Sequence, residues 1–305
     1  MTPGTQEKIG ILPSLELLPF FDEDFMKGVG VNYTAYASYG SIARDMLVGN
    51  LAGGVLPWEI FASEVLALPG QRNQWTIAFF TKPSPAELVL KTPIHKSIHA
   101  ESGSGSKRIP AKLLIGIESR SSLTRHHFLK WLDTLNLNPK PEIVFKFLPM
   151  DQRLQGLPAD ALDGFIARSP WGLVAEERNL GTLEQDFSKS TLNQLLVTVC
   201  HKNLVTTQAL SQPTTLVKLS IAREKLTVRS HLESAASRMD ASGRPRIPFV
   251  FLAKAAKEHD IANSGNDIVA NVSRITAELQ NLQTLSLLPP QIAATEQTAK
   301  LLAPG

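Results

Sequence analysis

Short apolar runs alternate with amphipathic stretches through the first eighty residues. The strand-like patterns lie at residues 9–12, 32–37, 55–56 and 75–80, and the helix-like ones at residues 41–51 and 59–68. In the first helical stretch Ile42, Met46, Leu47 and Leu51 share one face. This strand–helix alternation predicts a mostly parallel sheet with helices on both faces.

A second set of strand and helix patterns follows a polar Gly/Ser tract at residues 102–106. Its strands are predicted at residues 112–117, 142–148 and 162–167, and its helices at residues 123–135 and 150–157. From residue 192 onward the chain is rich in helical patterns. We therefore predict an α/β protein of two lobes, with residues 1–107 plus 201–305 forming lobe one and residues 108–200 inserted as lobe two. A ligand cleft is expected between the lobes, at the carboxyl ends of the strands.

Composition and charge narrow the class of partner. The 305 residues are 43% hydrophobic and 19% charged, with a formal net charge of +3, which is ordinary for a globular protein and too weakly basic to predict direct binding of nucleic acid. The single cysteine, Cys200, excludes an internal disulfide and Cys-based metal sites. The chain as written begins without a signal-peptide pattern and lacks an apolar run of membrane-spanning length. It is therefore expected to be cytoplasmic and not inserted into a membrane, or periplasmic if a signal peptide has been removed.

The turns that follow the predicted strands carry the candidate ligand-binding residues. Such turns present the N–H groups of helix starts, which suit anions. The candidates in lobe one are Pro13, Ser14, Tyr39, Gly40 and Trp58. The alternative for Trp58 is a role in core packing, and an ionised Glu59 beside it in the cleft would disfavour an anion.

The candidate turn of lobe two follows the strand at residues 112–117. It combines hydroxyl groups with one cation, and its candidate residues are Ser119, Arg120, Ser121 and Thr124. Arg120 is the expected charge partner of an anion, because no other candidate turn contains a cationic residue. The alternative is local capping by Ser121 or Ser122, with Arg120 in solvent.

Catalytic and metal-binding motifs are absent or weak. The chain lacks a phosphate-binding loop and a strict nucleophile elbow. His126 and His127 are adjacent and point to different faces of their helix. His95 and His99 have the i, i+4 spacing of a helical metal site, but Pro93 and the Gly/Ser tract argue against a helix there. We therefore predict no catalytic residues, no metal site and no cofactor.

Five segments resemble a known family of transport proteins. The first strand ends in Pro13, residues 36–45 end in the pair Arg44 and Asp45, and residues 53–58 end in Trp58. In lobe two, residues 119–139 combine a turn rich in small residues, a helix ending in Trp131 and Leu132, and an Asn-Pro turn. Residues 162–171 combine an Asp-Gly-Phe strand with a crossing that ends in Pro170 and Trp171. The chain is similar in these segments to the nitrate/bicarbonate-binding family of ABC-transporter solute-binding proteins.

This resemblance implies a type II periplasmic-binding fold and a small ligand such as nitrate or bicarbonate. It also implies a partner, which is either an ABC permease or, for a sensor derived from the family, a cytosolic regulatory protein. Two departures affect the ligand: Ser169 stands where the family has Glu, and Leu123 and Thr124 stand where it has Thr-His. The second hypothesis is an enzyme on the same fold, of the type found in pyrimidine or menaquinone-precursor pathways.

Overall fold

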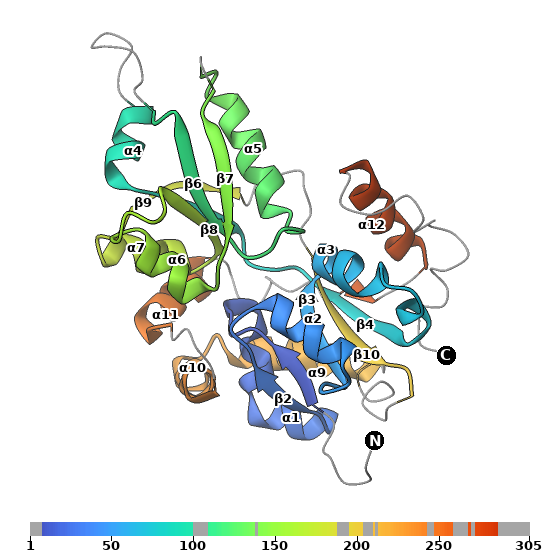
Figure 1. Cartoon of the computed structure of the whole chain (residues 1–305). Coiled ribbons are helices and arrows are strands. Elements are labelled where there is room, and N and C mark those ends of the chain that lie inside the picture. The colour runs from blue at the N-terminus through green and yellow to red at the C-terminus, as the bar shows by residue number, and fades with distance from the viewer. Residues whose placement is uncertain are drawn as a thin grey trace. The chain divides into compact units, whose positions relative to one another are not determined.

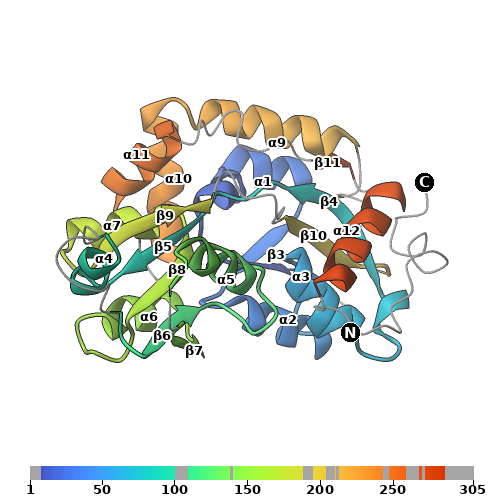
Figure 2. The ribbon, with the colours of Figure 1, turned by 90° about the horizontal axis from the view of Figure 1, so that it is seen from above.

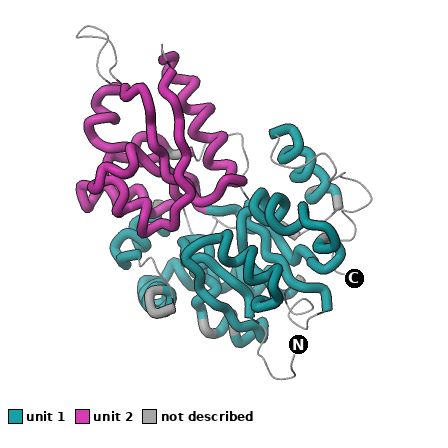
Figure 3. Tube along the Cα trace, in the orientation of Figure 1, with its two compact units in different colours: residues 1–83, 194–305 teal, residues 84–193 magenta. Residues whose placement is uncertain are grey.

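The computed structural model describes residues 8–99, 109–137, 140–187, 195–203, 210, 213–242, 247–258, 268–269 and 272–285. The chain divides into two compact units, called unit 1 (residues 1–83 and 194–305) and unit 2 (residues 84–193; Figure 3). Unit 2 therefore begins at residue 84 rather than at the predicted residue 108, and it ends at 193 rather than 200. The Gly/Ser tract and the Asn138-Pro139 turn lie outside the described residues.

Unit 1 is built on a six-stranded mixed sheet with the order β11-β4-β10-β3-β1-β2. The strands are β1 (Lys8–Ile11), β2 (Asn32–Ala35), β3 (Gly53–Pro57), β4 (Trp75–Thr81), β10 (Leu196–His201) and β11 (Ile268–Val269). β1 pairs in parallel with both β2 and β3, whereas β10 runs antiparallel between β3 and β4. The predicted parallel arrangement is therefore confirmed for the first three strands.

Helices cover both faces of this sheet. Figures 1 and 2 show α2 and α3 on one face and α1 and α9 on the other. The helical segments are η1 (Leu15–Phe21), α1 (Glu23–Val29), α2 (Tyr39–Leu47), α3 (Trp58–Ile60), η2 (Phe61–Leu66), η3 (Gln71–Asn73), α9 (Pro213–Lys225), α10 (Arg229–Ser242), α11 (Phe249–Glu258) and α12 (Val272–Thr284). Within the described residues no helix is both long and apolar enough to cross a membrane.

Two strand glycines let α2 pack closely on the sheet. A Cβ atom on Gly10 would lie 3.0 Å from Ile42 Cγ2, and one on Gly54 would lie 2.6 Å from the same atom. Ile42 is fully buried at this contact, as its place on the apolar face predicts. The helix starts where Ser38 Oγ accepts a hydrogen bond from the Ser41 N–H at 3.2 Å. The glycines and the cap together fix the start of α2 near the end of β2.

Unit 2 contains a five-stranded mixed sheet with the order β7-β6-β8-β5-β9. Its strands are β5 (Ala86–Leu90), β6 (Lys112–Ile117), β7 (Glu142–Phe147), β8 (Gly164–Arg168) and β9 (Thr182–Asp186), and its helices are α4 (Thr92–Ile98), α5 (Thr124–Thr134), α6 (Met150–Gly156) and α7 (Trp171–Glu177). β5 pairs antiparallel with β8 and β9, whereas β6 is parallel to β7 and β8. Because β5 belongs to this sheet, residues 84–107 belong to unit 2.

The strand β5 is buried along its whole length, although its second residue, Glu87, is acidic. Alternate residues of β5 contribute to an apolar core cluster that also contains side chains of α4 and α5. Glu87 lies on the opposite face, where its Oε2 accepts a hydrogen bond from the Gly172 N–H at 2.7 Å. This bond compensates the burial of the carboxylate and connects the start of α7 to the sheet.

Candidate functional site

In unit 1 the predicted residues follow three neighbouring parallel strands. Ser14 precedes η1 directly after β1, Tyr39 begins α2 after β2, and Trp58 begins α3 after β3. Because β3, β1 and β2 are adjacent and parallel, their carboxyl ends lie at the same end of the sheet. The fold therefore brings Pro13-Ser14, Tyr39-Gly40 and Trp58 to the place where open α/β sheets bind ligands.

Two of these side chains carry buried polar atoms with no hydrogen-bond partner among the described residues. They are Ser14 Oγ and Trp58 Nε1, and the residues are only 5% and 2% exposed. Leaving such a group unsatisfied costs about 1–3 kcal/mol. Buried polar groups in native proteins are nearly always satisfied by protein, water or ligand. These two atoms can therefore serve as hydrogen-bonding groups for a small polar ligand.

Trp58 is held firmly by its surroundings. Its ring lies 5.9 Å from that of Phe80 in an edge-to-face arrangement, and 6.1 Å from that of Phe61. Its backbone N–H donates to the Leu195 carbonyl oxygen at 2.8 Å. Trp58 thus has the packing role that the sequence left open as an alternative, while its indole N–H remains available.

Acidic side chains lie close to the same turns. Glu59 directly follows Trp58 and is fully buried. A Cβ atom on Gly40 would lie 3.9 Å from Glu64 Oε2. The candidate turns of unit 1 thus supply neutral hydrogen-bonding groups and nearby carboxylates, and any cation for an anionic ligand must come from another part of the chain.

In unit 2 the hydroxyl-rich turn before α5 is hydrogen-bonded within itself. Ser122 Oγ donates to Glu118 Oε1 at 2.9 Å and lies 2.8 Å from Thr124 Oγ1. It also accepts from the Thr124 N–H, and Ser119 Oγ accepts from the Ser121 N–H, both at 3.2 Å. The fold brings the predicted serines and threonine together. Ser122 Oγ binds the N–H at the start of α5 locally, although the N-cap residue is Leu123, which makes no side-chain cap.

Arg120 lies on the surface of this turn rather than among its buried hydroxyls. The residue is exposed, and its Cζ lies 5.5 Å from the centre of the Phe147 ring. A cation held over an aromatic face in this way is stabilised locally. The position of Arg120 therefore matches the alternative in which it is a surface side chain.

Arg168 is a buried cation of unit 2 that was not among the residues predicted from the sequence. It is the last residue of β8 and only 5% exposed. Its Nη1 donates to the Ser84 carbonyl oxygen at 3.5 Å. The positive charge of Arg168 also acts on His127, a buried residue of α5. A charged residue at the carboxyl end of a buried strand was the signal that could have identified it.

Burial and the charge of Arg168 lower the pKa of His127 to about 4. In the unfolded chain His127 has the ordinary histidine pKa of about 6.5. As the pH falls, the imidazole is therefore protonated at a higher pH in the unfolded chain than in the folded one. The stability that depends on neutral His127 is present above pH 6.5 and is lost as the pH falls toward 4. We expect a loss of about 2 kcal/mol between pH 7 and pH 5 from this group.

Urea unfolding of His127→Phe measures this loss. Phenylalanine keeps the ring contact with Phe187, whose ring centre lies 5.2 Å away, but cannot be protonated. The variant should lose less stability than the wild type between pH 7 and pH 5, by about 2 kcal/mol. His126→Gln, at the half-buried neighbouring position, is the comparison: burial and the charge of Arg125 also lower the pKa of His126, and its replacement should change the pH dependence less than His127→Phe does. Equal pH dependence in the wild type and His127→Phe would contradict the assignment.

Solved structures similar to this chain share its fold at low sequence identity. The periplasmic nitrate-binding protein NrtA of Synechocystis PCC 6803 matches with a TM-score of 0.69 and 13% identity, covering 97% of this chain and 85% of the other. The alkanesulfonate-binding protein SsuA of Xanthomonas axonopodis pv. citri, bound to MOPS, matches with a TM-score of 0.67 and 12% identity over 96% and 98% of the two chains. The desulfurization enzyme DSZB matches with a TM-score of 0.58 and 14% identity over 97% and 99%.

These similarities show a two-lobed α/β fold of the type II periplasmic-binding class, as the sequence predicted. They include both binding proteins and an enzyme, so they leave the activity open. No curated protein sequence matches the chain. A family model matches residues 20–236, which is more than half of the chain. The chain belongs to the NMT1-like family.

Proposed function

We propose that this chain is a non-enzymatic solute-binding protein for a small ligand that carries an anionic group. The observation that carries the proposal is a pair of buried polar atoms, Ser14 Oγ and Trp58 Nε1, that have no hydrogen-bond partner in the described part of the chain and lie at the ends of adjacent strands. A ligand with hydrogen-bonding atoms would satisfy both groups and recover the cost of burying them. The similarity in fold to nitrate- and alkanesulfonate-binding proteins supports this class of function.

We propose Arg168, in place of Arg120, as the charge partner of the anionic group. A buried guanidinium interacts with an anion more strongly than an exposed one, because solvent screens it less. The exposed Arg120 is already stacked on Phe147. Nitrate, bicarbonate and alkanesulfonates all offer oxygen atoms for such a charged hydrogen bond.

The proposed mechanism requires binding alone. Ligand binding stabilises whichever conformation of the chain binds the ligand more tightly, and the difference in affinity sets the size of that shift. An ABC permease or a regulatory protein can then recognise the liganded form. Small-angle scattering with and without the anion found in the screen measures whether the conformation changes.

Catalysis is the second candidate function, and one observation favours it. His127 is a buried, neutral imidazole next to Arg168, and a neutral imidazole is a common general base. The single cysteine is an unsuitable nucleophile for such a site, because Cys200 is fully buried in β10. The chemical fate of the bound ligand separates the two candidates.

A thermal-shift screen tests the proposed class of ligand. Nitrate, nitrite, bicarbonate and short alkanesulfonates would each be compared with sodium chloride at equal ionic strength. A true ligand at about 100 times its dissociation constant adds about 2.7 kcal/mol of stability. If none of these anions raises the melting temperature above the chloride control, the proposed anionic class is wrong.

Replacing Trp58 by phenylalanine tests the indole N–H directly. The variant keeps an aromatic ring against Phe61 and Phe80, removes the indole N–H, for which the described residues offer no acceptor, and leaves a smaller ring in the core. We expect some loss of stability from the smaller ring. Affinity for the ligand found in the screen should fall by about 0.5–1.5 kcal/mol, the usual net value of one hydrogen bond. Isothermal titration of the variant measures this loss.

Trp75→Phe is the matched control for this experiment. Trp75 is also buried in unit 1, but its Nε1 donates to Gln71 Oε1 at 3.1 Å. Its replacement should lower stability and leave ligand affinity unchanged. Unaltered affinity in Trp58→Phe, or an equal loss in both variants, would remove Trp58 from the site.

A further inference from the structure

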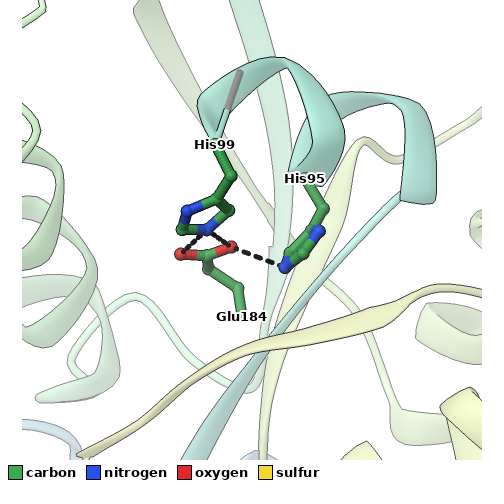
Figure 4. A group of neighbouring side chains, drawn as sticks. All are labelled: His95, His99 and Glu184. Carbon is green, nitrogen blue, oxygen red and sulfur yellow. Dashed lines mark hydrogen bonds and ion pairs between the residues drawn. The ribbon is translucent and has the colours of Figure 1, made fainter. Parts of the chain in front are cut away.

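Two histidines and a glutamate converge in unit 2, away from the turns discussed above. His95 belongs to α4, His99 is the C-cap residue of that helix, and Glu184 belongs to β9 (Figure 4). The nearest carboxylate oxygen of Glu184 lies 2.9 Å from His99 Nε2 and 3.4 Å from His95 Nε2. One ligand atom from each of the three residues lies within 4.8 Å of the other two.

The local sequence explains why these side chains meet. Pro93 occupies the first turn of α4, where proline is tolerated because its missing N–H has no helical acceptor. The helix therefore forms, contrary to the expectation from sequence, and places His95 and His99 one turn apart on the same side. The buried Ile94 and Ile98 attach this helix to the core cluster of the sheet.

Strand β9 provides the third residue at an irregularity in its pairing. Leu183 pairs with Val89 and Gln185 pairs with Leu88, so Glu184 lies where the register between β9 and β5 shifts. Thr182 Oγ1 lies 3.1 Å from Thr92 Oγ1, at the start of α4. That contact aligns the helix with the strand, and Glu184 meets the imidazoles two residues farther along the strand.

The composition of this cluster suits a metal ion better than a simple ion pair. The side chain of Glu184 is only 3% exposed and faces two imidazoles, whose ring centres lie 4.7 Å apart. Two imidazole nitrogens and one carboxylate oxygen form a donor set that suits a zinc-class ion. A single divalent cation can use one atom from each of the three residues.

The distances match the geometry of zinc. Zinc binds imidazole nitrogen and carboxylate oxygen at about 2.0–2.2 Å and prefers four ligands in a tetrahedron. Tetrahedral ligand atoms are then about 3.3 Å apart, close to the separations of the Glu184 oxygens from both Nε2 atoms. The side chain of His99 is 55% exposed, so the fourth position can be taken by water.

We propose that His95, His99 and Glu184 form a binding site for a divalent transition metal of the zinc class. The metal joins α4 to β9, which is an edge strand of the sheet. It thereby connects two segments separated by more than eighty residues of sequence. The proposal stands independently of the solute-binding function, because all three ligands lie in unit 2 and none belongs to the candidate turns.

Isothermal titration of the full-length protein, free of any affinity tag, with zinc chloride tests the proposal. We expect one zinc ion per chain in the wild type. His99→Ala and Glu184→Gln should each weaken zinc binding at least tenfold. His231→Ala is the matched control, because His231 is an exposed histidine on α10 of unit 1. The zinc affinity of this variant should stay within twofold of that of the wild type.

Two further measurements distinguish the loss of a metal site from a loss of folding in the variants. Zinc should raise the melting temperature of the wild type but not of His99→Ala, whose own melting temperature without metal should be close to that of the wild type. Magnesium should have no effect at the same concentration, because it prefers oxygen ligands. Absence of zinc binding in the wild type, or full binding in both site variants, would overturn the proposal.

Discussion

Replacing Gly53 by alanine is expected to destabilise unit 1 by about 3 kcal/mol or more. A Cβ atom at this position would lie 2.1 Å from the Val199 carbonyl oxygen and 3.0 Å from Cys200 Cα. Both atoms belong to the backbone of β10, which is hydrogen-bonded on both sides, so the strand cannot move away without losing its pairing. Overpacking a core typically costs 1–3 kcal/mol, and a backbone obstacle places this substitution at the upper end or beyond.

Urea or thermal unfolding measures this loss, and Gly28→Ala is the control. Gly28 lies in α1, where a Cβ atom would make only ordinary contacts at 3.7 Å or more. Alanine there should leave stability unchanged or raise it, because it favours the helix. A Gly53→Ala protein as stable as the wild type would contradict the close pairing of β3 with β10, and with it the position of Trp58 at the end of β3.

Replacing Arg168 by methionine is expected to reduce affinity for the anionic ligand by about 1.5–3 kcal/mol, the scale of a charged hydrogen bond. Methionine fills a similar volume but has neither the charge nor the donors. Arg168→Lys should lose less affinity, because the charge remains while the forked geometry is lost. Arg120→Ala should bind like the wild type, because Arg120 is exposed and stacked on Phe147.

Isothermal titration of the three variants with the anion found in the screen separates these outcomes. Unfolding in urea shows whether each variant is folded at the temperature of titration. A large loss of anion affinity in Arg120→Ala, with normal affinity in Arg168→Met, would instead identify Arg120 as the charge partner, as predicted from the sequence. Normal binding in both variants would exclude both Arg120 and Arg168 as the charge partner.

The sequence predicted those elements whose pattern is local. The first three strands of unit 1 and the helix α2 were recognisable because apolar side chains recur at strand or helix spacing, and their order alone implies parallel pairing. The strands β5 and β9 were missed. β5 carries Glu87 in the middle of an apolar run, and β9 is largely polar. Their pairing with each other joins segments about a hundred residues apart, which no local pattern encodes.

The candidate site was predictable only in part for the same reason. Positions at the ends of parallel strands were correctly placed by strand order, as Ser14, Tyr39 and Trp58 illustrate. Which arginine is buried could not be read from the turn residues, because burial depends on the strand that carries Arg168 and on its distant neighbour Ser84. The spacing of His95 and His99 was visible in the sequence, but their partner Glu184 is supplied by tertiary structure.

The most direct test of the central claim is the fate of the ligand. The protein would be incubated for hours with a stoichiometric excess of the anion that stabilises it, and then denatured to release all bound molecules. Quantitative NMR or mass spectrometry of the solution should recover the anion completely and unchanged, with one equivalent bound before denaturation. Accumulation of a product beyond one equivalent of protein would contradict the claim and identify the chain as an enzyme.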